Sequence, residues 1–313
     1  MNGVAYLFAG QGAQYVGMGK ALAEAYSDEF AAIRPAIDGL GIDLTDVCFE
    51  GPQEKLTNTE YAQPGIYWVS WLAKAALESR LPQIRSKVAA TAGLSLGEFT
   101  ALTSANVWSF EDGLKVVHAR GKAMQESCEA SQGGMAAIIG LDIEKLEGLC
   151  QDCGVTLANL NCPGQIVVSG PKESVRELCE KAGAAGAKRA LPLDVAGAYH
   201  SPLMEPAAQS LRSVLTSVAI EAPGVPAMSN VTGQPHGTPE SIRSLLVDQV
   251  TSPVRWEDCI RHLIASGIHT FVELGPGKAL SGFMKRIDKS ASVVNVEDPD
   301  SLDKAVDFLG NLA

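Results

Sequence analysis

The pattern of apolar and polar positions predicts strands that alternate with helices through most of the chain. Short apolar runs bounded by small or polar residues predict buried strands at 4–8, in the run that begins at 88, at 269–274 and at 293–296. Longer apolar or amphipathic segments predict helices at 21–26, 28–40, 64–80, 111–128, 204–218, 241–247, 256–265 and 279–287. A sheet whose strands are connected by crossover helices is an α/β architecture.

The pattern changes in the middle of the chain. There it predicts, in order, a strand at 134–140, a helix at 143–150, strands at 155–161 and 165–170, a helix at 173–182 and a strand at 188–195. The order β-α-β-β-α-β is the signature of a ferredoxin-like unit. We therefore predict a small ferredoxin-like domain over 129–196, inserted into a larger, discontinuous domain made of 1–128 and 197–313.

The most informative short motif is Gly93-Leu94-Ser95-Leu96-Gly97, which stands between an apolar run and the opening of a predicted helix. Strand, turn and helix in this order are the context of a nucleophile elbow, in which a serine sits on a strained turn. The two glycines would let strand and helix approach closely, and backbone N–H groups at the start of the helix could hold an oxyanion. The motif also occurs in ordinary turns, so other residues have to decide its meaning.

A candidate base and a candidate binding residue lie further along the chain. His200 stands in a small-residue loop ahead of a predicted helix, whose N-terminus would disfavour the imidazolium and keep the ring neutral, as a base must be. No comparable signal surrounds the other histidines, His118, His236, His262 and His269. Arg120 lies on the predicted helix 111–128, where by itself it would be a solvated surface residue.

Composition narrows the functional class. The 313 residues carry 36 acidic and 25 basic side chains, and the net charge of −11 disfavours a nucleic-acid partner. No apolar run is long enough to predict a membrane span, and the start of the chain lacks the basic segment of a secretion signal. Seven scattered cysteines favour reduced thiols in a cytoplasmic protein, and the lone pair Cys150 and Cys153 predicts no metal site. The loop 9–14 lacks the lysine and spacing of a phosphate-binding loop.

Four segments together resemble one family. They are Gly10-Gln11-Gly12-Ala13-Gln14, the elbow with Glu98, Arg120 within 118–125, and His200 within 197–204. In order and spacing they resemble the malonyl-CoA:acyl-carrier-protein transacylases and the related acyltransferase domains of polyketide synthases, over about residues 3–290. The resemblance implies an α/β-hydrolase-like large domain with a ferredoxin-like small one.

The resemblance also implies catalytic roles. Ser95 would be the nucleophile and His200 its base, with the imidazole oriented by the backbone carbonyl of Gln249 instead of by an acid. The backbone N–H groups of Gln11 and Leu96 would form the oxyanion hole. The family has a substrate arginine that matches Arg120; its planar guanidinium would pair with the free carboxylate of a malonyl group and reject acetyl groups. The loop 159–165 resembles the family segment that borders the cleft.

Two positions depart from the usual family pattern. Leu94 stands where the family usually carries histidine, and we expect it to affect acyl preference, rate or the polarity of the pocket mouth. Tyr199 stands where phenylalanine is more usual, in the variant with a bulky aromatic that is associated with unbranched malonyl groups. The hydroxyl of a buried tyrosine needs a hydrogen-bond partner.

The implied reaction moves a malonyl group from malonyl-CoA to the phosphopantetheine thiol of acyl-carrier protein, by a ping-pong mechanism through a malonyl-serine ester. It implies no permanently bound cofactor, no nucleic-acid or membrane partner, and a monomer; fatty-acid and polyketide synthesis both stay open. Carrier proteins are acidic, so docking on this acidic chain needs a local basic patch. The candidates are Lys188, Arg189, Lys278, Lys285 and Arg286.

Three alternatives also stay open. The first is a serine esterase or acyl-carrier-protein hydrolase, which would have no use for a carboxylate-pairing arginine and would need an acid, for which Asp194 is the nearest candidate before His200. The second is a non-catalytic protein that binds carrier protein. The third uses Cys162 as a nucleophile, although no spaced histidine partner accompanies it.

Overall fold

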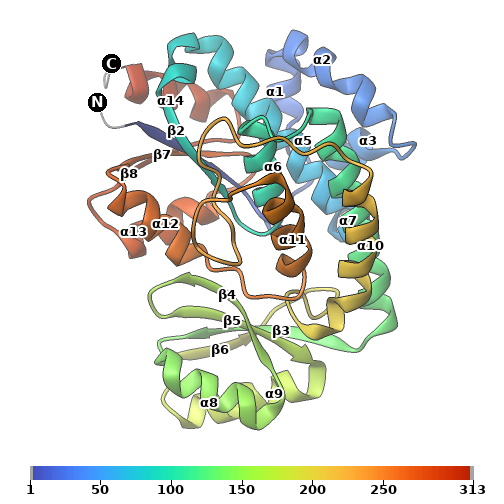
Figure 1. Cartoon of the computed structure of the whole chain (residues 1–313), viewed down its shortest axis with the longest axis vertical. Coiled ribbons are helices and arrows are strands. Elements are labelled where there is room, and N and C mark those ends of the chain that lie inside the picture. Colours follow the sequence, from blue (N-terminus) through green and yellow to red (C-terminus); the bar gives the residue numbers. More distant parts are fainter. Residues whose placement is uncertain (1–2, 311–313) are drawn as a thin grey trace.

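In the computed structural model, which describes residues 3–310, the chain forms two lobes, each built on its own four-stranded sheet (Figure 1). The sheet of the larger lobe has the order β2-β1-β7-β8, and its neighbouring strands are parallel. Its strands are β1 (Val4–Phe8), β2 (Val88–Gly93), β7 (Thr270–Leu274) and β8 (Ser292–Val296). A parallel sheet is covered on both faces, which explains why all five residues of β1 are buried.

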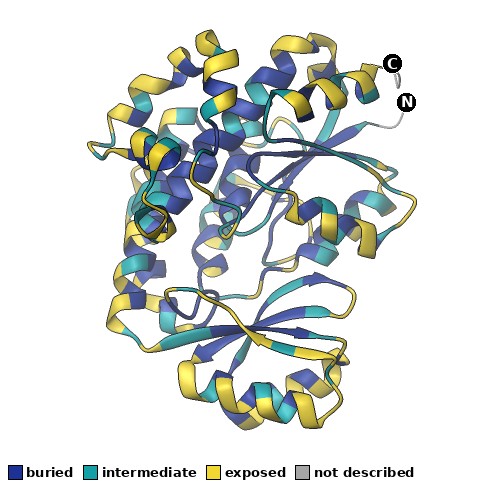
Figure 2. Ribbon diagram, turned by 180° about the vertical axis from the view of Figure 1, so that it is seen from behind, coloured by how far each residue is buried: buried dark blue, intermediate teal, exposed yellow. Residues whose placement is uncertain are grey.

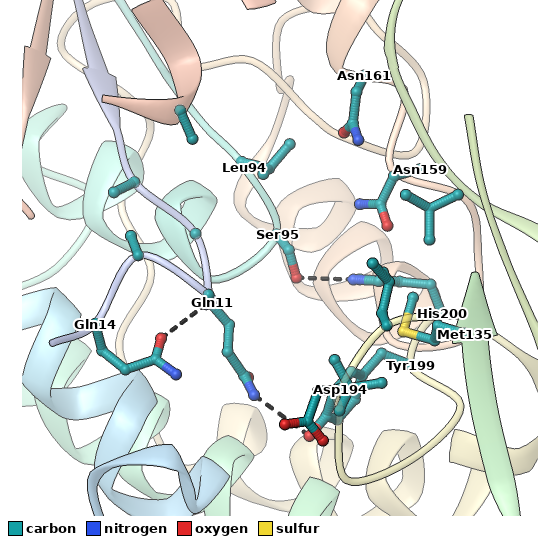
Figure 3. A pocket seen from close by; sticks show the side chains of 18 of the residues that line it. Gln11, Gln14, Leu94, Ser95, Met135, Asn159, Asn161, Asp194, Tyr199 and His200 are labelled. Atoms are coloured by element: carbon teal, nitrogen blue, oxygen red, sulfur yellow. Dashed lines mark hydrogen bonds between the residues drawn. The ribbon is translucent and has the colours of Figure 1, made fainter. Parts of the chain in front are cut away.

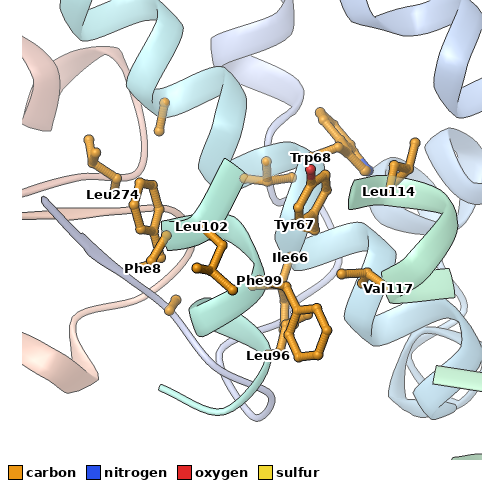
Figure 4. Packing of buried hydrophobic residues seen from close by; sticks show 14 of the residues in the cluster. Phe8, Ile66, Tyr67, Trp68, Leu96, Phe99, Leu102, Leu114, Val117 and Leu274 are labelled. Carbon is orange, nitrogen blue, oxygen red and sulfur yellow. The ribbon is translucent and has the colours of Figure 1, made fainter. Parts of the chain in front are cut away.

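Helices surround the larger sheet. They are α1 (Lys20–Ala25), α2 (Ser27–Asp38), α3 (Leu44–Glu50), α4 (Gln53–Thr57), α5 (Thr59–Arg80), η1 (Pro82–Lys87), α6 (Leu96–Ser104), α7 (Phe110–Ala130), η2 (Pro202–Met204), α10 (Glu205–Thr216), α11 (Pro239–Gln249), α12 (Trp256–Ala265), α13 (Ala279–Ile287) and α14 (Pro299–Gly310). Side chains from β1, β7, α5, α6 and α7 interlock in the main core, as Phe8, Phe99, Tyr67 and Val117 illustrate (Figure 4). This core packs α6 against β1 and β2, and it packs α7 against α5 and α6.

The predicted start of one helix is wrong. The sequence pattern begins it at Pro64, whereas α5 begins at Thr59, because the side chain of Asn58 caps it by accepting a hydrogen bond from the N–H of Glu60. Pro64 is accommodated inside the helix. No helix was predicted for α3, α4 or α14. The predicted helices 256–265 and 279–287 match α12 and α13 at both ends, and the other predicted helices match observed ones with at least one end shifted.

The smaller lobe contains the predicted order of strands and helices. It runs through β3 (Gly133–Ile139), α8 (Ile143–Cys153), β4 (Thr156–Cys162), β5 (Gln165–Pro171), α9 (Lys172–Ala184) and β6 (Arg189–Pro192). Its strands are antiparallel in the order β4-β5-β3-β6, and they share a separate apolar cluster with α8 and α9. Both helices lie on one face of the sheet and expose their outer sides (Figure 2). The strand β6 is shorter than the predicted 188–195 and ends at Pro192, although the N–H of Leu193 still donates to the carbonyl of Met135 in β3.

Backbone hydrogen bonds join the two lobes beside the strand ends. The N–H of Leu160 in β4 donates to the carbonyl of Val254, and the N–H of Val254 donates to the carbonyl of Ala158. The small sheet is thereby held against the segment that precedes α12. Within residues 3–310, no helix is long and apolar enough to cross a membrane, and no group of three or more His, Cys, Asp or Glu side chains could hold a metal ion.

Candidate active site

Ser95 occupies a strained turn between β2 and α6. Its backbone angles are φ 53° and ψ −103°, a conformation that L-residues rarely adopt. Glycine is required on both sides of the turn: a Cβ on Gly93 would collide with the backbone of Gly97, and a Cβ on Gly97 would collide with the carbonyl of Phe8 at the end of β1. The elbow predicted from the sequence is therefore present, at the carboxyl end of two adjacent parallel strands.

His200 lies next to the serine hydroxyl. Its Nε2 is 2.8 Å from Ser95 Oγ (Figure 3). Its Nδ1 is 2.8 Å from the backbone carbonyl of Gln249. Gln249 is the last residue of α11, so its carbonyl has no partner within the helix and can accept the Nδ1–H. That bond leaves the Nε2 lone pair facing the hydroxyl, which is the tautomer that a general base needs.

The charge state of His200 has a different cause from the one predicted. Burial, and then the nearby positive charge of Arg120, lower the pKa of His200 from 6.5 to about 4. The next element is the short helix η2, and the N-terminus of the longer α10 follows only at Glu205. The imidazole is thus neutral at physiological pH because it is buried beside a guanidinium.

Arg120 is a buried residue of α7 and not a solvated one. Its side chain is fully buried, and its Nη1 donates to Gln63 Oε1 at 2.7 Å. Its Nη2 donates to Gln249 Oε1 at 2.9 Å and to Ser95 Oγ at 3.1 Å. The guanidinium also lies 5.1 Å from the centroid of the Phe99 ring. Burial lowers the pKa of Arg120 to about 10, which still leaves a full positive charge at neutral pH, and its three acceptors are all neutral.

A buried polar network supports the elbow from behind. The side-chain oxygen of Asn230 accepts the N–H of Ser95 at 2.6 Å, and its Nδ2 donates to the carbonyl of Gly93 at 2.8 Å. Glu98, at the start of α6, accepts hydrogen bonds from the N–H of Asn230, from Gln249 Nε2 and from His236 Nε2. These contacts fix the backbone of the turn from two sides.

Gln11 and Tyr199 meet on the other side of the serine. Gln11 Nε2 donates to the hydroxyl of Tyr199 at 3.3 Å and to Thr59 Oγ1 at 3.2 Å, and the two hydroxyls lie 2.7 Å apart. The partner that a buried tyrosine hydroxyl needs is therefore Thr59 together with Gln11. Gln63 in turn donates to Gln11 Oε1 at 3.2 Å. The loop that carries Gln11 is thus tied to α5 and to the histidine segment.

A cavity of about 300 Å³ lies between the two lobes and contains Ser95 and His200. Leu94, Leu280 and Phe283 make an apolar part of its wall, and the small lobe contributes Asn159 and Asn161. In Figure 3 the serine hydroxyl points toward His200, while the two asparagines enter from the small-lobe side. The predicted border loop 159–165 therefore begins at the cavity, which has the size and the mixed lining of a small-molecule site.

The structure disfavours two of the alternative chemistries. Asp194 lines the cavity, but the Nδ1 of His200 is bonded to the Gln249 carbonyl and not to a carboxylate. Cys162 is buried, and burial raises the pKa of its thiol, so little thiolate would be present at neutral pH. Of the side chains considered as nucleophiles, Ser95 is the one whose hydroxyl lies beside the imidazole of His200.

The basic candidates for docking fall into two groups. Lys188 and Arg286 lie near each other. The Lys188 side chain lies against Gly140, and the Arg286 guanidinium lies beside Gly164. The two glycines are joined by a hydrogen bond from the N–H of Gly140 to the carbonyl of Gly164. Arg189 and Lys285 are exposed next to these two side chains in sequence. Lys278, at the start of α13, is instead paired with Glu297 at 2.9 Å.

Several site residues escaped sequence analysis. Gln63, Asn230, Glu98 and Thr59 contact predicted site residues directly, and His236 contacts them through Glu98. Glu98 was within a quoted motif, so its position directly after the elbow was an available signal. The others are single polar residues on distant segments, and nothing in the local pattern marks them.

The chain is similar to known acyltransferases over its whole length. The family model described as acyl transferase domain matches residues 5–308. The malonyl CoA-acyl carrier protein transacylase of Bacillus subtilis (strain 168) is 41% identical over 314 residues, covering 99% of this chain and 98% of that protein. The crystal structure of an acyl-carrier-protein-S-malonyltransferase from Bartonella henselae superposes with a TM-score of 0.93 at 39% identity, covering 98% of this chain and 99% of that one.

A second solved structure contains a partner protein. It is a malonyl-transacylase in complex with a type II polyketide synthase acyl-carrier protein, and it matches this chain with a TM-score of 0.92 at 36% identity. The match covers 98% of this chain and 99% of that one. Coverage this high in both directions means that the likeness extends over both lobes of this chain.

Proposed function

The chain belongs to the family of acyl transferase domains, and we propose that it transfers a malonyl group from malonyl-CoA to the phosphopantetheine thiol of acyl-carrier protein. The observation that carries this proposal is the joint presence, around one hydroxyl, of a neutral imidazole and a buried guanidinium whose acceptors are neutral. The first activates a nucleophile, and the second selects a substrate that brings its own negative charge. The product would supply extender units for fatty-acid or polyketide synthesis.

The first half-reaction forms an ester on Ser95. Its Oγ attacks the thioester carbonyl of malonyl-CoA while His200 Nε2 takes the hydroxyl proton. The carbonyl oxygen becomes an oxyanion, which the backbone N–H groups of Gln11 and Leu96 would hold; Leu96 is the first residue of α6, so its N–H has no partner within the helix. The carbon–sulfur bond then breaks, and the coenzyme A thiolate leaves with the proton from His200.

The second half-reaction reverses these roles. The phosphopantetheine thiol of acyl-carrier protein gives its proton to His200 and attacks the ester carbonyl. The same N–H groups hold the second oxyanion, and the Ser95 oxygen leaves and takes the proton back. The enzyme returns to its first state, so the two substrates act in a ping-pong order.

Arg120 would hold the malonyl carboxylate during both steps. A bidentate pair with a carboxylate replaces hydrogen bonds to neutral oxygens by stronger charge-assisted ones. An acetyl group cannot do so and leaves the buried charge without a direct counter-ion, which disfavours its reaction. This arginine also argues against a simple esterase, which would have no use for a buried cation beside the nucleophile.

For carrier-protein docking we propose the basic patch formed by Lys188, Arg189, Lys285 and Arg286. Both segments that carry it run from the patch to the cavity: β6 continues into Leu193, and α13 begins with residues that line the wall. An acidic carrier protein on this patch could therefore extend its phosphopantetheine arm toward Ser95. Lys278 fits this role less well because Glu297 already neutralises it.

We further interpret the mixed α/β fold as an α/β-hydrolase-like domain (1–128 and 197–313) with a ferredoxin-like insertion (129–196). The strand order β4-β5-β3-β6 and the separate apolar cluster of the small lobe support this division. The protein would act as a cytoplasmic monomer without a permanently bound cofactor. Seven free cysteines agree with a reducing compartment.

The proposal is tested by intact-mass measurement of the protein after incubation with malonyl-CoA. The wild-type chain should gain one malonyl group, and added acyl-carrier protein should remove it and become malonylated. Ser95→Ala should gain no label, because it lacks the attacking oxygen. Ser131→Ala, at the C-terminal end of α7, is a control that should label normally. Covalent label on Ser95→Ala would overturn the proposal, and label lost to water at the same rate without carrier protein would indicate a hydrolase.

A further inference from the structure

The carboxylate of Glu98 is the least expected feature of the site. It is fully buried, lies three residues after the nucleophile, and takes no part in the reaction described above. One of its oxygens, Oε2, accepts from the N–H of Asn230 at 3.0 Å and from Gln249 Nε2 at 2.6 Å. The other accepts from His236 Nε2 at 2.7 Å. Three donors from three different segments are thus directed at one buried carboxylate.

The Gln249 side chain lies between this carboxylate and Arg120. Its Nε2 donates to Glu98, and its Oε1 accepts from Arg120 Nη2 at 2.9 Å. A single amide therefore separates the two opposite charges. The charge of Glu98 still acts on Arg120 across this amide. Burial lowers the pKa of Arg120, and the negative charge of Glu98 raises it.

This separation has a chemical consequence. A carboxylate in direct contact with the guanidinium would occupy the donors that a malonyl carboxylate needs. With no counter-charge at all, the empty site would hold a bare buried cation, which is costly. Glu98, separated from Arg120 by the Gln249 amide, stabilises the cation in the empty enzyme. Because the two charges are not in direct contact, the guanidinium can still bind the carboxylate of a substrate.

We propose that Glu98 is a positioning residue that sets the strength of the malonyl-binding guanidinium through the Gln249 amide. This inference rests on the proposed function, because it assigns a role in selecting the malonyl group. In the malonyl complex, Glu98 and the substrate carboxylate repel each other across the arginine. The repulsion keeps malonyl binding from becoming too tight for release in the second half-reaction.

The decisive variant is Glu98→Gln, which keeps the shape and removes the charge. Its oxygen can still accept from Asn230 and Gln249, while its NH₂ faces His236, whose Nε2 can accept in the other tautomer. Initial rates of Ser95 acylation are measured with malonyl-CoA and with acetyl-CoA at the same pH. Loss of the repulsion should raise the ratio of malonyl to acetyl kcat/KM by about tenfold. This is the effect of two charges roughly 12 Å apart, with an amide and a guanidinium between them, at an effective dielectric constant of about 20.

A merely structural role predicts the opposite. If Glu98 only holds the turn together, its replacement should loosen the guanidinium and lower the malonyl preference. The matched control is Glu78→Gln, which removes another buried carboxylate, one paired with Lys74 and Arg85 on α5 and η1. It should leave the ratio unchanged. A ratio that stays constant or falls in Glu98→Gln, or that rises equally in the control, overturns the proposal.

A stability measurement covers the case in which Glu98→Gln folds poorly. The cause of the instability should then be the positive charge of Arg120, which no longer has a nearby negative charge. Glu98→Gln combined with Arg120→Gln should therefore have a higher Tm than Glu98→Gln alone. A double variant that is equally or less stable refutes the electrostatic link. If the wild-type chain takes no malonyl label, the proposed function fails. The Tm comparison of the single and double variants still tests the electrostatic link between Glu98 and Arg120, because it does not depend on activity.

Discussion

The neutral state of His200 leads to a specific prediction about pH. The histidine is 4% exposed, and burial followed by the charge of Arg120 lowers its pKa from 6.5 to about 4. The imidazole should therefore remain a competent base well below pH 6.5. We expect kcat/KM for acylation of Ser95 to be flat as the pH falls through 6.5 and to decline only near pH 4.

The same shift affects stability, and its sign follows from proton counting. Between pH 6.5 and about 4 the unfolded chain protonates this histidine and the folded chain does not, so the unfolded state binds more protons. The contribution to stability is fully present above pH 6.5 and is lost as the pH falls toward 4. The difference between the two pKa values amounts to about 3 kcal/mol. His200→Gln lacks this contribution, so its stability should fall less steeply in that window.

The assay is the initial rate of Ser95 labelling by intact mass across this pH range, with unfolding by denaturant measured in parallel. Arg120→Gln, assayed with acetyl-CoA, removes the second cause of the shift and should move the acid limb to higher pH. The limb should still lie below 6.5, because burial is the larger cause. An acid limb at 6.5 in the wild-type enzyme would refute the burial argument, and an unmoved limb in Arg120→Gln would refute the electrostatic one.

Three further predictions concern single contacts. Arg120→Ala should reduce malonyl acylation by about 100-fold while acetyl acylation falls much less, since a charge-assisted pair is lost; an unchanged malonyl-to-acetyl ratio would exclude it from the acyl site. Tyr199→Phe removes the hydroxyl that accepts from Gln11, and it should lower kcat about fivefold with little change in KM for malonyl-CoA; a raised KM with intact kcat would instead indicate a role in substrate binding. Lys188→Glu with Arg189→Glu should raise KM for carrier protein and weaken its salt dependence without affecting self-acylation, whereas Lys145→Glu on the outer helix α8 should do neither; unchanged carrier-protein kinetics would exclude the patch.

The sequence predicted the elements whose signals are local. The strand β1 is a continuous apolar run, and the elbow depends on glycines that no other residue can replace. The order of elements in the small lobe could be derived because the spacing of apolar residues changes between the strand pattern and the helix pattern at the turns between elements. The start of α5 was misplaced because proline is a strong local signal, whereas the Asn58 cap that defines the true start is a weaker one.

The hydrogen bonds that hold the site residues in place could not be predicted, because they join residues that are far apart in the sequence. Asn230 lies 135 residues from the serine whose N–H it accepts, and His236 lies 138 residues from Glu98. A polar residue on a loop has the same local pattern whether it faces solvent or a buried partner. Likewise, the pattern of α7 left Arg120 on a solvated face, because the segments that bury it come from elsewhere in the chain.

Leu94, one of the two positions that depart from the usual family pattern, lies apart from this buried polar network. Leu94 is half-buried, and like Phe283 it packs against the apolar cluster that includes Leu280 and Met284 of α13; its side chain lies against Gly10. It has no contact in the polar network that joins Arg120 to Glu98, which is complete in this chain. The residues that we propose to face a malonyl carboxylate are therefore separate from the part of the wall that contains Leu94. Its effect should fall on the thioester arm that passes this wall, so Leu94→His should change KM for malonyl-CoA and for carrier protein together. A changed malonyl-to-acetyl ratio with both KM values intact would contradict this separation.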